Sequence, residues 1–477
     1  MSLVFLNMPF TSLLFIFIFL PISTILYCVL PYKWWRTAIL LISSLLFYTW
    51  GEPLFVFLLI FMVFLNWILG ITIERSNQNN KQELANSVKV LAIILNLLPL
   101  LILKILTSQY FTNFSKISMI SNLDGLSFPL GLSFFTFSTI SYIIDVYRKE
   151  IKAENNFFDF AIFLFMFPKI GQGPITRYKN VVSKIKNPVI KIENIAKGLR
   201  RFVTGLAKKV LVADYLGAVS NKVFSLDLNS LNPQIAWYGL IAFTLQIFLD
   251  FSAYTDMAIG LGNILGFELP ENFNFPYISR NITEFWRRWH MTLADWFRTY
   301  LFIPLEISRR KVRFYRQETN LILVFIATGL WHGITINFIL WGLYFGIIIA
   351  LESNFLGKWL KRMNPIFQHA YALLLISFGW VFFKLENVSS WMPFFRSLSG
   401  LNNSNTYSLR SLNILLYYPL MIVGILICIP IHKKLSEKLQ YNILLRSLAD
   451  MVLIVLLIVS VSLIASGNYR AFLYAEF

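Results

Sequence analysis

The stretch that decides the class of fold is residues 319–351, which read TNLILVFIATGLWHGITINFILWGLYFGIIIAL. It is almost wholly apolar and longer than the roughly 20 residues that cross the hydrocarbon core of a bilayer. His332 follows about eleven mostly apolar residues, so at about 1.5 Å per residue it lies about 16–18 Å inside the segment. That depth is near the middle of a layer about 30 Å thick, where an ionisable residue is expensive and indicates a functional site.

His332 has two interpretations. Burial favours the neutral imidazole, which can accept a proton as a general base. Alternatively, the imidazole bonds to a neighbouring helix and is structural. We favour function for His332 and helix packing for the glycine pairs Gly329/Gly333 and Gly342/Gly346, whose spacing lets helix backbones approach closely.

The rest of the chain has the same apolar character. Of 477 residues, 57% are hydrophobic and 14% charged, against about 25% charged in soluble proteins. The 46 Phe, 21 Tyr and 13 Trp exclude disorder, and the two cysteines, Cys28 and Cys428, exclude a disulfide scaffold. We therefore predict an all-α polytopic membrane protein with a single membrane domain over residues 1–477. Besides 319–351, candidate membrane segments are 10–30, 37–50, 53–73, 88–106, 129–144, 157–173, 235–249, 370–385, 412–431 and 448–466.

Two features modify this topology. Residues 10–30 lack a preceding basic region and are interpreted as a retained helix rather than a signal peptide. Residues 157–173 end in Pro168, Gly171 and Gly173, which break a helix. An interrupted segment survives at membrane depth only when it is buried in protein or lines a wet cavity, which predicts a bundle with a pocket.

The formal net charge of +18 is concentrated in two blocks. Residues 177–209 contribute +9 and residues 280–316 contribute +6, so the remaining residues are close to neutral. The positive-inside rule places such blocks in the cytoplasm. This concentration argues against a nucleic-acid binder and suits anionic lipid or a phosphate-bearing donor.

The second block overlaps residues 271–304, ENFNFPYISRNITEFWRRWHMTLADWFRTYLFIP. Too polar to span, it suits a helix at the interface or inside the bundle. Helical spacing predicts that Trp286 and His290 share a face, as do Glu284 and Arg288. Its aromatics and arginines suit a headgroup-level belt, but His290 is not explained by a belt.

Residues 245–266, LQIFLDFSAYTDMAIGLGNILG, contain Asp250 and Asp256 within an apolar stretch. These carboxylates could orient a histidine or bind a cation. We favour ion pairing with a buried basic residue, since buried carboxylates usually have a partner.

Common catalytic fingerprints are missing from the sequence. It contains no GxGxxG, GxxxxGK[ST], HExxH, CxxC or GxSxG, so ATP-driven transport, metal-dependent hydrolysis and serine-hydrolase chemistry lack motif support, and no metal site is expected. Two histidines in or near the membrane fit a transferase with a histidine base. They also fit a transporter with a histidine proton relay.

The order of motifs resembles the membrane-bound O-acyltransferase superfamily, above all its bacterial polysaccharide-acetylating branch. The resembling pieces are GLSFFTFSTISYIIDVYR (131–148), FPKIGQGPITRY (167–178), residues 250–305, WHG (331–333), WG (341–342) and the final FLYAEF. The resemblance implies a ring of about 9–12 transmembrane helices with re-entrant and interfacial helices, and a catalytic core at about 125–350. It also implies that His332 is the catalytic histidine and His290 the second active-site histidine.

The implied activity is transfer of a short acyl group, most simply acetyl, from a cytoplasmic thioester such as acetyl-CoA to an extracytoplasmic polysaccharide. No bound cofactor is expected, and the location would be the bacterial cytoplasmic (inner) membrane, in contact with lipid. An SGNH-type extracytoplasmic acetyltransferase is the expected partner. Asp250, Asp256, Trp331 and Asn337 are supporting candidates, and Arg287, Arg288, Lys208 and Lys209 are candidate contacts for donor phosphates.

Other functions stay open. A secondary transporter or flippase of a polysaccharide precursor, and a catalytically silent scaffold, are the alternatives. Lys169, the segment 305–311 and Ala475 depart from the family pattern, which leaves the acylated polymer open. Tyr474 could relay the acyl group, although an interfacial tyrosine is the simpler interpretation.

Overall fold

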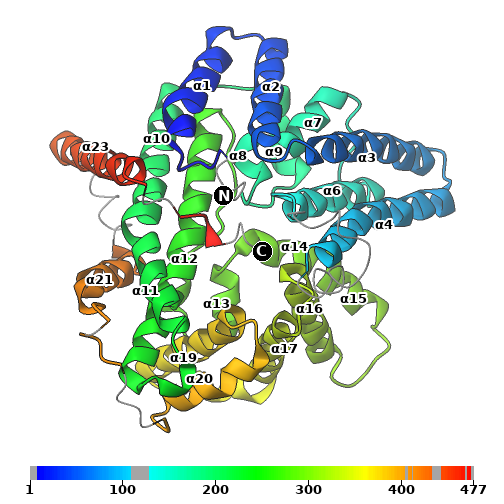
Figure 1. Ribbon diagram of the computed structural model, residues 1–477. Helices are drawn as coiled ribbons and strands as arrows, with labels where there is room; N and C mark the ends of the chain where they lie inside the picture. The colour runs from blue at the N-terminus through cyan, green and yellow to red at the C-terminus, as the bar shows by residue number, and fades with distance from the viewer. Residues whose placement is uncertain are drawn as a thin grey trace, which may run out of the picture. The chain divides into compact units, whose positions relative to one another are not determined.

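The computed structural model describes residues 8–108, 128–402, 407–410, 412–431, 442–467 and 470–473. All regular secondary structure in these ranges is helical (Figure 1), which confirms the all-α class. Among the described residues, six helical segments are long and apolar enough to cross a membrane: Phe55–Gln78, Gln82–Leu106, Pro233–Ile264, Ile336–Leu360, Pro365–Lys384 and Ile443–Ala465. Shorter apolar helical segments are Phe15–Val29, Leu132–Tyr147 and Leu415–Ile427.

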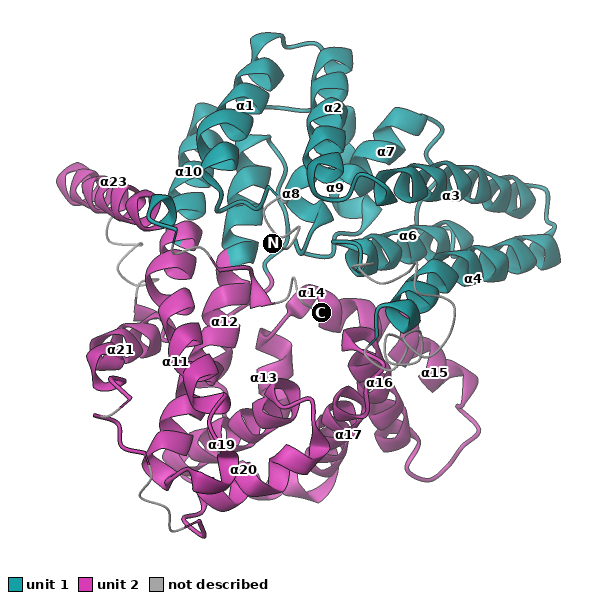
Figure 2. Cartoon of the chain, viewed as in Figure 1, with its two compact units in different colours: residues 1–204, 254–271, 464–467 teal, residues 205–253, 272–463, 468–477 magenta. Residues whose placement is uncertain are grey.

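The chain divides into two compact units, coloured separately in Figure 2. Unit 1 comprises Met1–Thr204, Tyr254–Glu271 and Ile464–Gly467, and unit 2 comprises Gly205–Ala253, Asn272–Leu463 and Asn468–Phe477. Helix α12 (Pro233–Ile264) contributes to both. The single membrane domain and the catalytic core at 125–350 stay predictions.

Unit 1 is built from the N-terminal helices. They are α1 (Leu20–Val29), α2 (Lys33–Gly51), α3 (Phe55–Gln78), α4 (Gln82–Leu106), α6 (Leu132–Tyr147), α7 (Phe157–Phe165), α8 (Phe167–Ile170), α9 (Tyr178–Lys186) and most of α10 (Ile192–Ala207). The predicted interruption of 157–173 is confirmed, because α7 ends at Phe165 and α8 is a single turn. In a continuous helix Pro168 would lack the N–H for its i→i−4 hydrogen bond and its ring would clash with the Leu164 carbonyl group, which explains why α7 does not run on through it.

Helices α3 and α4 are joined by a reciprocal amide pair. Asn66 Nδ2 donates to Asn96 Oδ1 at 3.1 Å, and Asn96 Nδ2 donates to Asn66 Oδ1 at 2.7 Å. Both side chains are fully buried. Because each amide satisfies the other, two polar residues are accommodated inside otherwise apolar membrane helices.

Unit 2 holds the residues of the candidate site. Its helices are α11 (Asp214–Phe224), α13 (Ile282–Arg288), α14 (Met291–Phe297), α15 (Ile303–Ser308), α16 (Arg316–His332), α17 (Ile336–Leu351), α18 (Gly357–Leu360), α19 (Pro365–Lys384), α20 (Trp391–Leu398), α21 (Tyr418–Ile427) and nearly all of α23 (Ile443–Ala465). Residues 319–351, predicted as one segment, instead form the packed helices α16 and α17. His332 therefore ends a helix rather than lying within a continuous one.

Candidate active site

Helices α16 and α17 pack so closely that glycine is required where they meet. A Cβ atom at Gly329 would overlap the Phe338 carbonyl oxygen, and one at Gly342 would overlap the Phe325 carbonyl oxygen. The predicted packing role of these glycines is confirmed. Their missing side chains bring the end of α16, and with it His332, against α17.

His332 lies in an aromatic cage. Its ring centroid is 4.7 Å from that of Trp331, 5.2 Å from Trp341, 5.2 Å from Phe383 and 6.0 Å from Phe338. The side chain is 7% exposed. Such surroundings exclude water, which strengthens hydrogen bonds and protects a reactive acyl compound from hydrolysis.

His290 lies at a break between two helices, which corrects one prediction. Helix α13 ends at Arg288, and His290 has φ +44° as the residue before α14. The uniform helical spacing predicted for Trp286 and His290 is therefore wrong, whereas the Glu284–Arg288 pair is confirmed at 2.9 Å. A left-handed conformation is uncommon for a residue with a side chain and often marks a functional site.

Asn272 determines which nitrogen of His290 carries the proton. Asn272 Oδ1 lies 3.1 Å from His290 Nδ1, and it accepts from Thr292 Oγ1 at 2.8 Å and Thr292 N at 3.3 Å. A backbone N–H can only donate, so the shared Asn272 atom is an oxygen acceptor. Its third neighbour, His290 Nδ1, must then carry a hydrogen. In the neutral imidazole this leaves the lone pair on Nε2.

Burial of His290 favours the neutral form of its imidazole. The side chain is 2% exposed, and burial lowers the pKa of His290 to about 3. The carboxamide of Asn272 adds no charge that would favour the imidazolium. His290 therefore offers a hydrogen-bond acceptor at Nε2 across the physiological pH range.

Trp331 connects the two histidines. Its ring centroid lies 6.1 Å from that of His290 and 4.7 Å from that of His332. The structure thus brings together three residues predicted for the site, although they are 42 positions apart in sequence at their extremes. Asn337, another residue predicted for the site, is fully buried on α17 and donates from Nδ2 to the Phe382 carbonyl oxygen at 3.5 Å.

Glu352 holds the helix that leads to His290. Its carboxylate accepts from Ile282 N and Thr283 N at 2.8 Å each, from Thr283 Oγ1 at 2.6 Å and from Tyr371 OH at 3.1 Å. Asn281 caps the same helix by accepting from Glu284 N at 2.7 Å. A negative charge at a helix N-terminus is stabilising, so these contacts fix α13.

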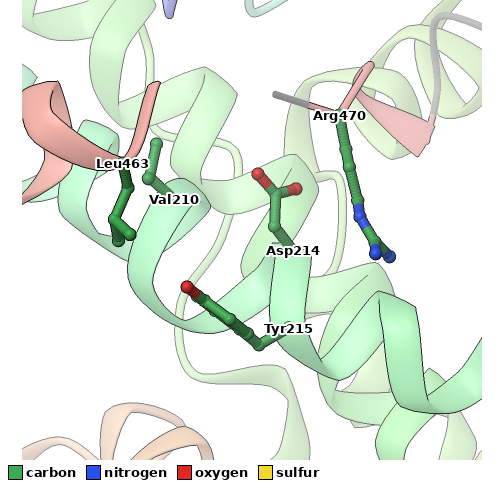
Figure 3. A pocket seen from close by; sticks show the side chains of 5 residues that line it. All are labelled: Val210, Asp214, Tyr215, Leu463 and Arg470. Atoms are coloured by element: carbon green, nitrogen blue, oxygen red, sulfur yellow. The ribbon is translucent and has the colours of Figure 1, made fainter. Parts of the chain in front are cut away.

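Lys209 and Asp250 form part of a buried ion cluster. Lys209 lies in a π-helical turn (Lys208–Ala213), and its ammonium is 2.6 Å from Asp250 Oδ1 and 2.7 Å from Asp214 Oδ1. Lys209 also donates to the Ala471 carbonyl oxygen at 3.0 Å, and Leu473 N donates to Asp250 Oδ2 at 2.7 Å. The cluster therefore fastens the segment 470–473 to α12 and the π-helical turn. Figure 3 shows Asp214 and Arg470 among the side chains lining the adjacent pocket.

Of the remaining candidate site residues, some have polar partners in the structure and one is exposed to solvent. Asp256 forms an ion pair with Arg201 at 3.0 Å. Ion pairing is what the sequence predicts for both Asp250 and Asp256. Lys208 donates to Ser252 Oγ at 3.1 Å, Arg288 is paired with Glu284, and Arg287 is exposed. Contacts of Arg287, Arg288, Lys208 and Lys209 with donor phosphates stay predictions.

The basic block at 177–209 carries less uncompensated charge than its sequence indicates. Carboxylates distant in sequence reach it: Lys179 pairs with Glu150, Lys184 with Glu268, Lys186 with Glu154, and Arg201 with both Asp256 and Glu271. Counting charge within the block alone therefore overstates the positive potential of its surface.

Sequence reasoning missed three residues of this arrangement: Asn272, Glu352 and Asp214. Each acts through a hydrogen bond or ion pair to another residue and matches no motif. In the sequence, only the position of Asn272 at the start of the segment that contains His290 indicates a role for it. Tyr474 lies outside the described residues.

Comparison with known proteins agrees with the family resemblance of the sequence motifs. Residues 109–385 match the family model described as MBOAT, membrane-bound O-acyltransferase family. The chain is 36% identical to the probable alginate O-acetylase of Pseudomonas aeruginosa, over 85% of this chain and 77% of that protein. It is 34% identical to the peptidoglycan O-acetyltransferase of Helicobacter pylori, over 82% and 80% of the two chains. It is 30% identical to the teichoic acid D-alanyltransferase of Bacillus subtilis, over 53% and 67%.

Proposed function

Because the chain belongs to the membrane-bound O-acyltransferase family and is a multi-pass membrane acyltransferase, we propose that it moves an acetyl or other short acyl group from a cytoplasmic thioester for O-acylation of an extracytoplasmic polysaccharide. The relatives named for alginate and peptidoglycan favour a cell-envelope polymer as the final acceptor. The proposed location is the bacterial cytoplasmic (inner) membrane.

One observation carries the proposal. Two buried histidines flank one tryptophan, with ring centroids 4.7 Å and 6.1 Å from Trp331. An acyl transfer to oxygen requires a base for the hydroxyl proton and a dry site that protects the thioester. The cage around His332 meets both requirements without any group besides protein side chains and the donor.

In the proposed reaction His332 is the general base. It takes the proton of the acceptor hydroxyl while the hydroxyl oxygen attacks the thioester carbonyl carbon. Collapse of the tetrahedral intermediate breaks the carbon–sulfur bond, and the leaving thiolate takes the proton from His332. His290, which carries its lone pair on Nε2 in the neutral form, accepts a hydrogen bond from the hydroxyl or from a water that relays the proton.

Acetyl-CoA is the proposed co-substrate, and an SGNH-type acetyltransferase outside the membrane is the proposed partner that completes transfer to the polymer. The exposed guanidinium of Arg287 is a candidate contact for donor phosphates. A transporter or flippase and a silent scaffold are the competing functions.

The experiment uses purified full-length protein in lipid nanodiscs with radiolabelled acetyl-CoA, with and without an alginate or peptidoglycan acceptor and the partner enzyme. We expect release of free thiol and label on acceptor or partner. Movement of acceptor across a vesicle membrane without acetyl-CoA would indicate a transporter. Activity that depends on the partner alone, and is unchanged by His332→Ala, would indicate a scaffold.

A further inference from the structure

Helix α17 carries a buried hydrogen-bond donor and a buried acceptor for which the described residues offer no partner. Trp341 is 1% exposed, and no atom among the described residues accepts from its Nε1. Asn337 is 0% exposed, and within the same described ranges its Oδ1 receives no hydrogen bond. An unpaired buried polar atom is unfavourable by about 1–3 kcal/mol, so two on one helix require an explanation.

The two groups share one face of α17 beside the candidate base. Residues 337 and 341 are four positions apart, so their side chains stand one above the other, about one helical turn of 5.4 Å apart along the axis. The Trp341 ring centroid lies 5.2 Å from that of His332, with the rings at 83°. The Trp341 ring therefore lies beside the imidazole of the candidate base, and Asn337 lies one helical turn before it on α17.

We propose that Trp341 and Asn337 form a subsite for a cysteamine thioester, the end group shared by coenzyme A and pantetheine carriers. Trp341 Nε1–H donates to the acyl carbonyl oxygen, and Asn337 Oδ1 accepts from the first amide N–H of the cysteamine arm. Only the sulfur and two methylene carbons separate that amide nitrogen from the acyl carbon. The amide nitrogen and the acyl carbon therefore lie about 5 Å apart, which matches the rise of one helical turn from residue 337 to residue 341.

This assignment rests on the proposed function and adds an electrophilic group to it. As the acceptor oxygen bonds to the carbonyl carbon and its proton passes to His332, the carbonyl electron pair moves onto oxygen. Trp341 Nε1–H stabilises that negative charge. When the carbonyl reforms, the carbon–sulfur bond breaks and the thiolate takes the proton from His332. A preorganised donor in a site without water is worth far more than the same donor in water.

The first test replaces the donor and keeps an aromatic side chain. Trp341→Phe is expected to lower kcat for acetyl-CoA by about 10²–10³-fold, the usual effect of removing one oxyanion donor. Trp380→Phe is the matched control, because Trp380 is also fully buried and its Nε1 also lacks a partner among the described residues. Its contacts are with Trp289, Phe285, Phe345 and Phe383, and the control is expected to change kcat by less than about threefold.

The second test concerns the hydrogen-bond acceptor Asn337 Oδ1 and separates a role in substrate binding from a role in folding. Wild-type protein is expected to prefer S-acetyl-N-acetylcysteamine over an acetyl thioester of equal length that lacks the amide, by about tenfold in kcat/KM. Asn337→Leu is expected to abolish this preference while retaining turnover of the thioester without the amide. A merely structural role of Asn337 would lower both rates together.

The outcomes are distinguishable. Equal losses in Trp341→Phe and Trp380→Phe, or a donor preference retained in Asn337→Leu, would overturn the subsite and leave the proposed function standing. Wild-type protein inert toward all three thioesters would overturn the proposed function together with the subsite. If Trp341→Phe does not accumulate in the membrane, benzothienylalanine at position 341 removes the N–H while retaining the ring size, and the same loss in kcat is expected.

Discussion

The Lys209 ammonium lies 2.6 Å from Asp250 Oδ1, and both side chains are only 2% exposed. Asp214 shares the same ammonium, and the Phe472 ring lies 4.5 Å from it. Two carboxylates around one lysine, with two hydrogen bonds to residues 471 and 473, make this cluster the attachment of the C-terminal segment to unit 2.

Removing the shared cation should destabilise the protein. Lys209→Met leaves two buried carboxylates without their partner, which is unfavourable by about 3–5 kcal/mol. We expect a lower midpoint of thermal unfolding in detergent. Lys208→Met is the control, because Lys208 makes a hydrogen bond to a hydroxyl group worth about 1 kcal/mol. A raised KM for the donor in Lys209→Met, with unchanged stability, would instead favour the donor-phosphate role.

Loss of either histidine should separate activity from folding. His332→Ala is expected to abolish acyl transfer, and His290→Ala to lower it by about 10²–10⁴-fold if His290 also handles a proton. Both variants should still accumulate in the membrane, which is checked by size-exclusion chromatography. His369→Gln serves as the control, since the one hydrogen bond of His369 within the described ranges joins it to the Ser279 carbonyl oxygen. Undiminished transfer in His332→Ala would remove His332 as the base.

Asn272→Asp should make activity sensitive to acidic pH. The wild-type imidazole of His290, with its pKa lowered to about 3, stays neutral throughout an assay from about pH 5 to 9. An aspartate at position 272 places a negative charge beside Nδ1, favours the imidazolium and raises the pKa of His290. The acidic limb of kcat/KM should therefore move to higher pH.

The control for that shift removes the hydrogen bond without adding charge. Asn272→Leu is expected to lower kcat because the proton is no longer fixed on Nδ1, but it should leave the acidic limb where it is in the wild type. An identical pH profile in Asn272→Asp and Asn272→Leu would contradict the electrostatic explanation.

The close contact of α16 with α17 should not tolerate a methyl group. Gly329→Ala places a Cβ on the Phe338 carbonyl oxygen, so the helices must separate, at about 1–3 kcal/mol, and His332 moves with the end of α16. We expect lower stability and a lower kcat. Gly424→Ala is the matched control, because the three nearest described atoms to its Cβ would be leucine methyl groups at 3.3–3.4 Å. Equal stability and equal kcat in the two variants would argue against the packed helices α16 and α17 as the support of His332.

Local sequence was sufficient for the class of fold, and it singled out His290 and His332 as candidate site residues. Apolar runs predicted helices such as α3 and α4, and Pro168 predicted the break after α7. Histidines in apolar or aromatic surroundings stood out because charge and polarity are rare there. These features depend on neighbours within one or two helical turns, which a single sequence displays.

Other features depend on partners distant in the chain and could not be predicted. The helical spacing around Trp286 gives no sign that the helix ends at Arg288, because that break is stabilised by Asn272, 18 residues before His290. Lys209 was counted as available charge because its carboxylate partner Asp250 lies 41 residues away. Pairings at such separations are set by the packing of whole helices, which local patterns do not encode.

The division of the chain has a consequence for its synthesis. Neither unit is one continuous stretch, since unit 1 comprises residues 254–271 and 464–467 as well as 1–204, and unit 2 begins in the interval between the first two of these. Helix α12 also supplies residues to both units. The ribosome must therefore synthesise the whole of Gly205–Ala253 before residues 254–271 can join the first unit. Cutting the gene at residue 204 would not yield two independently folding halves.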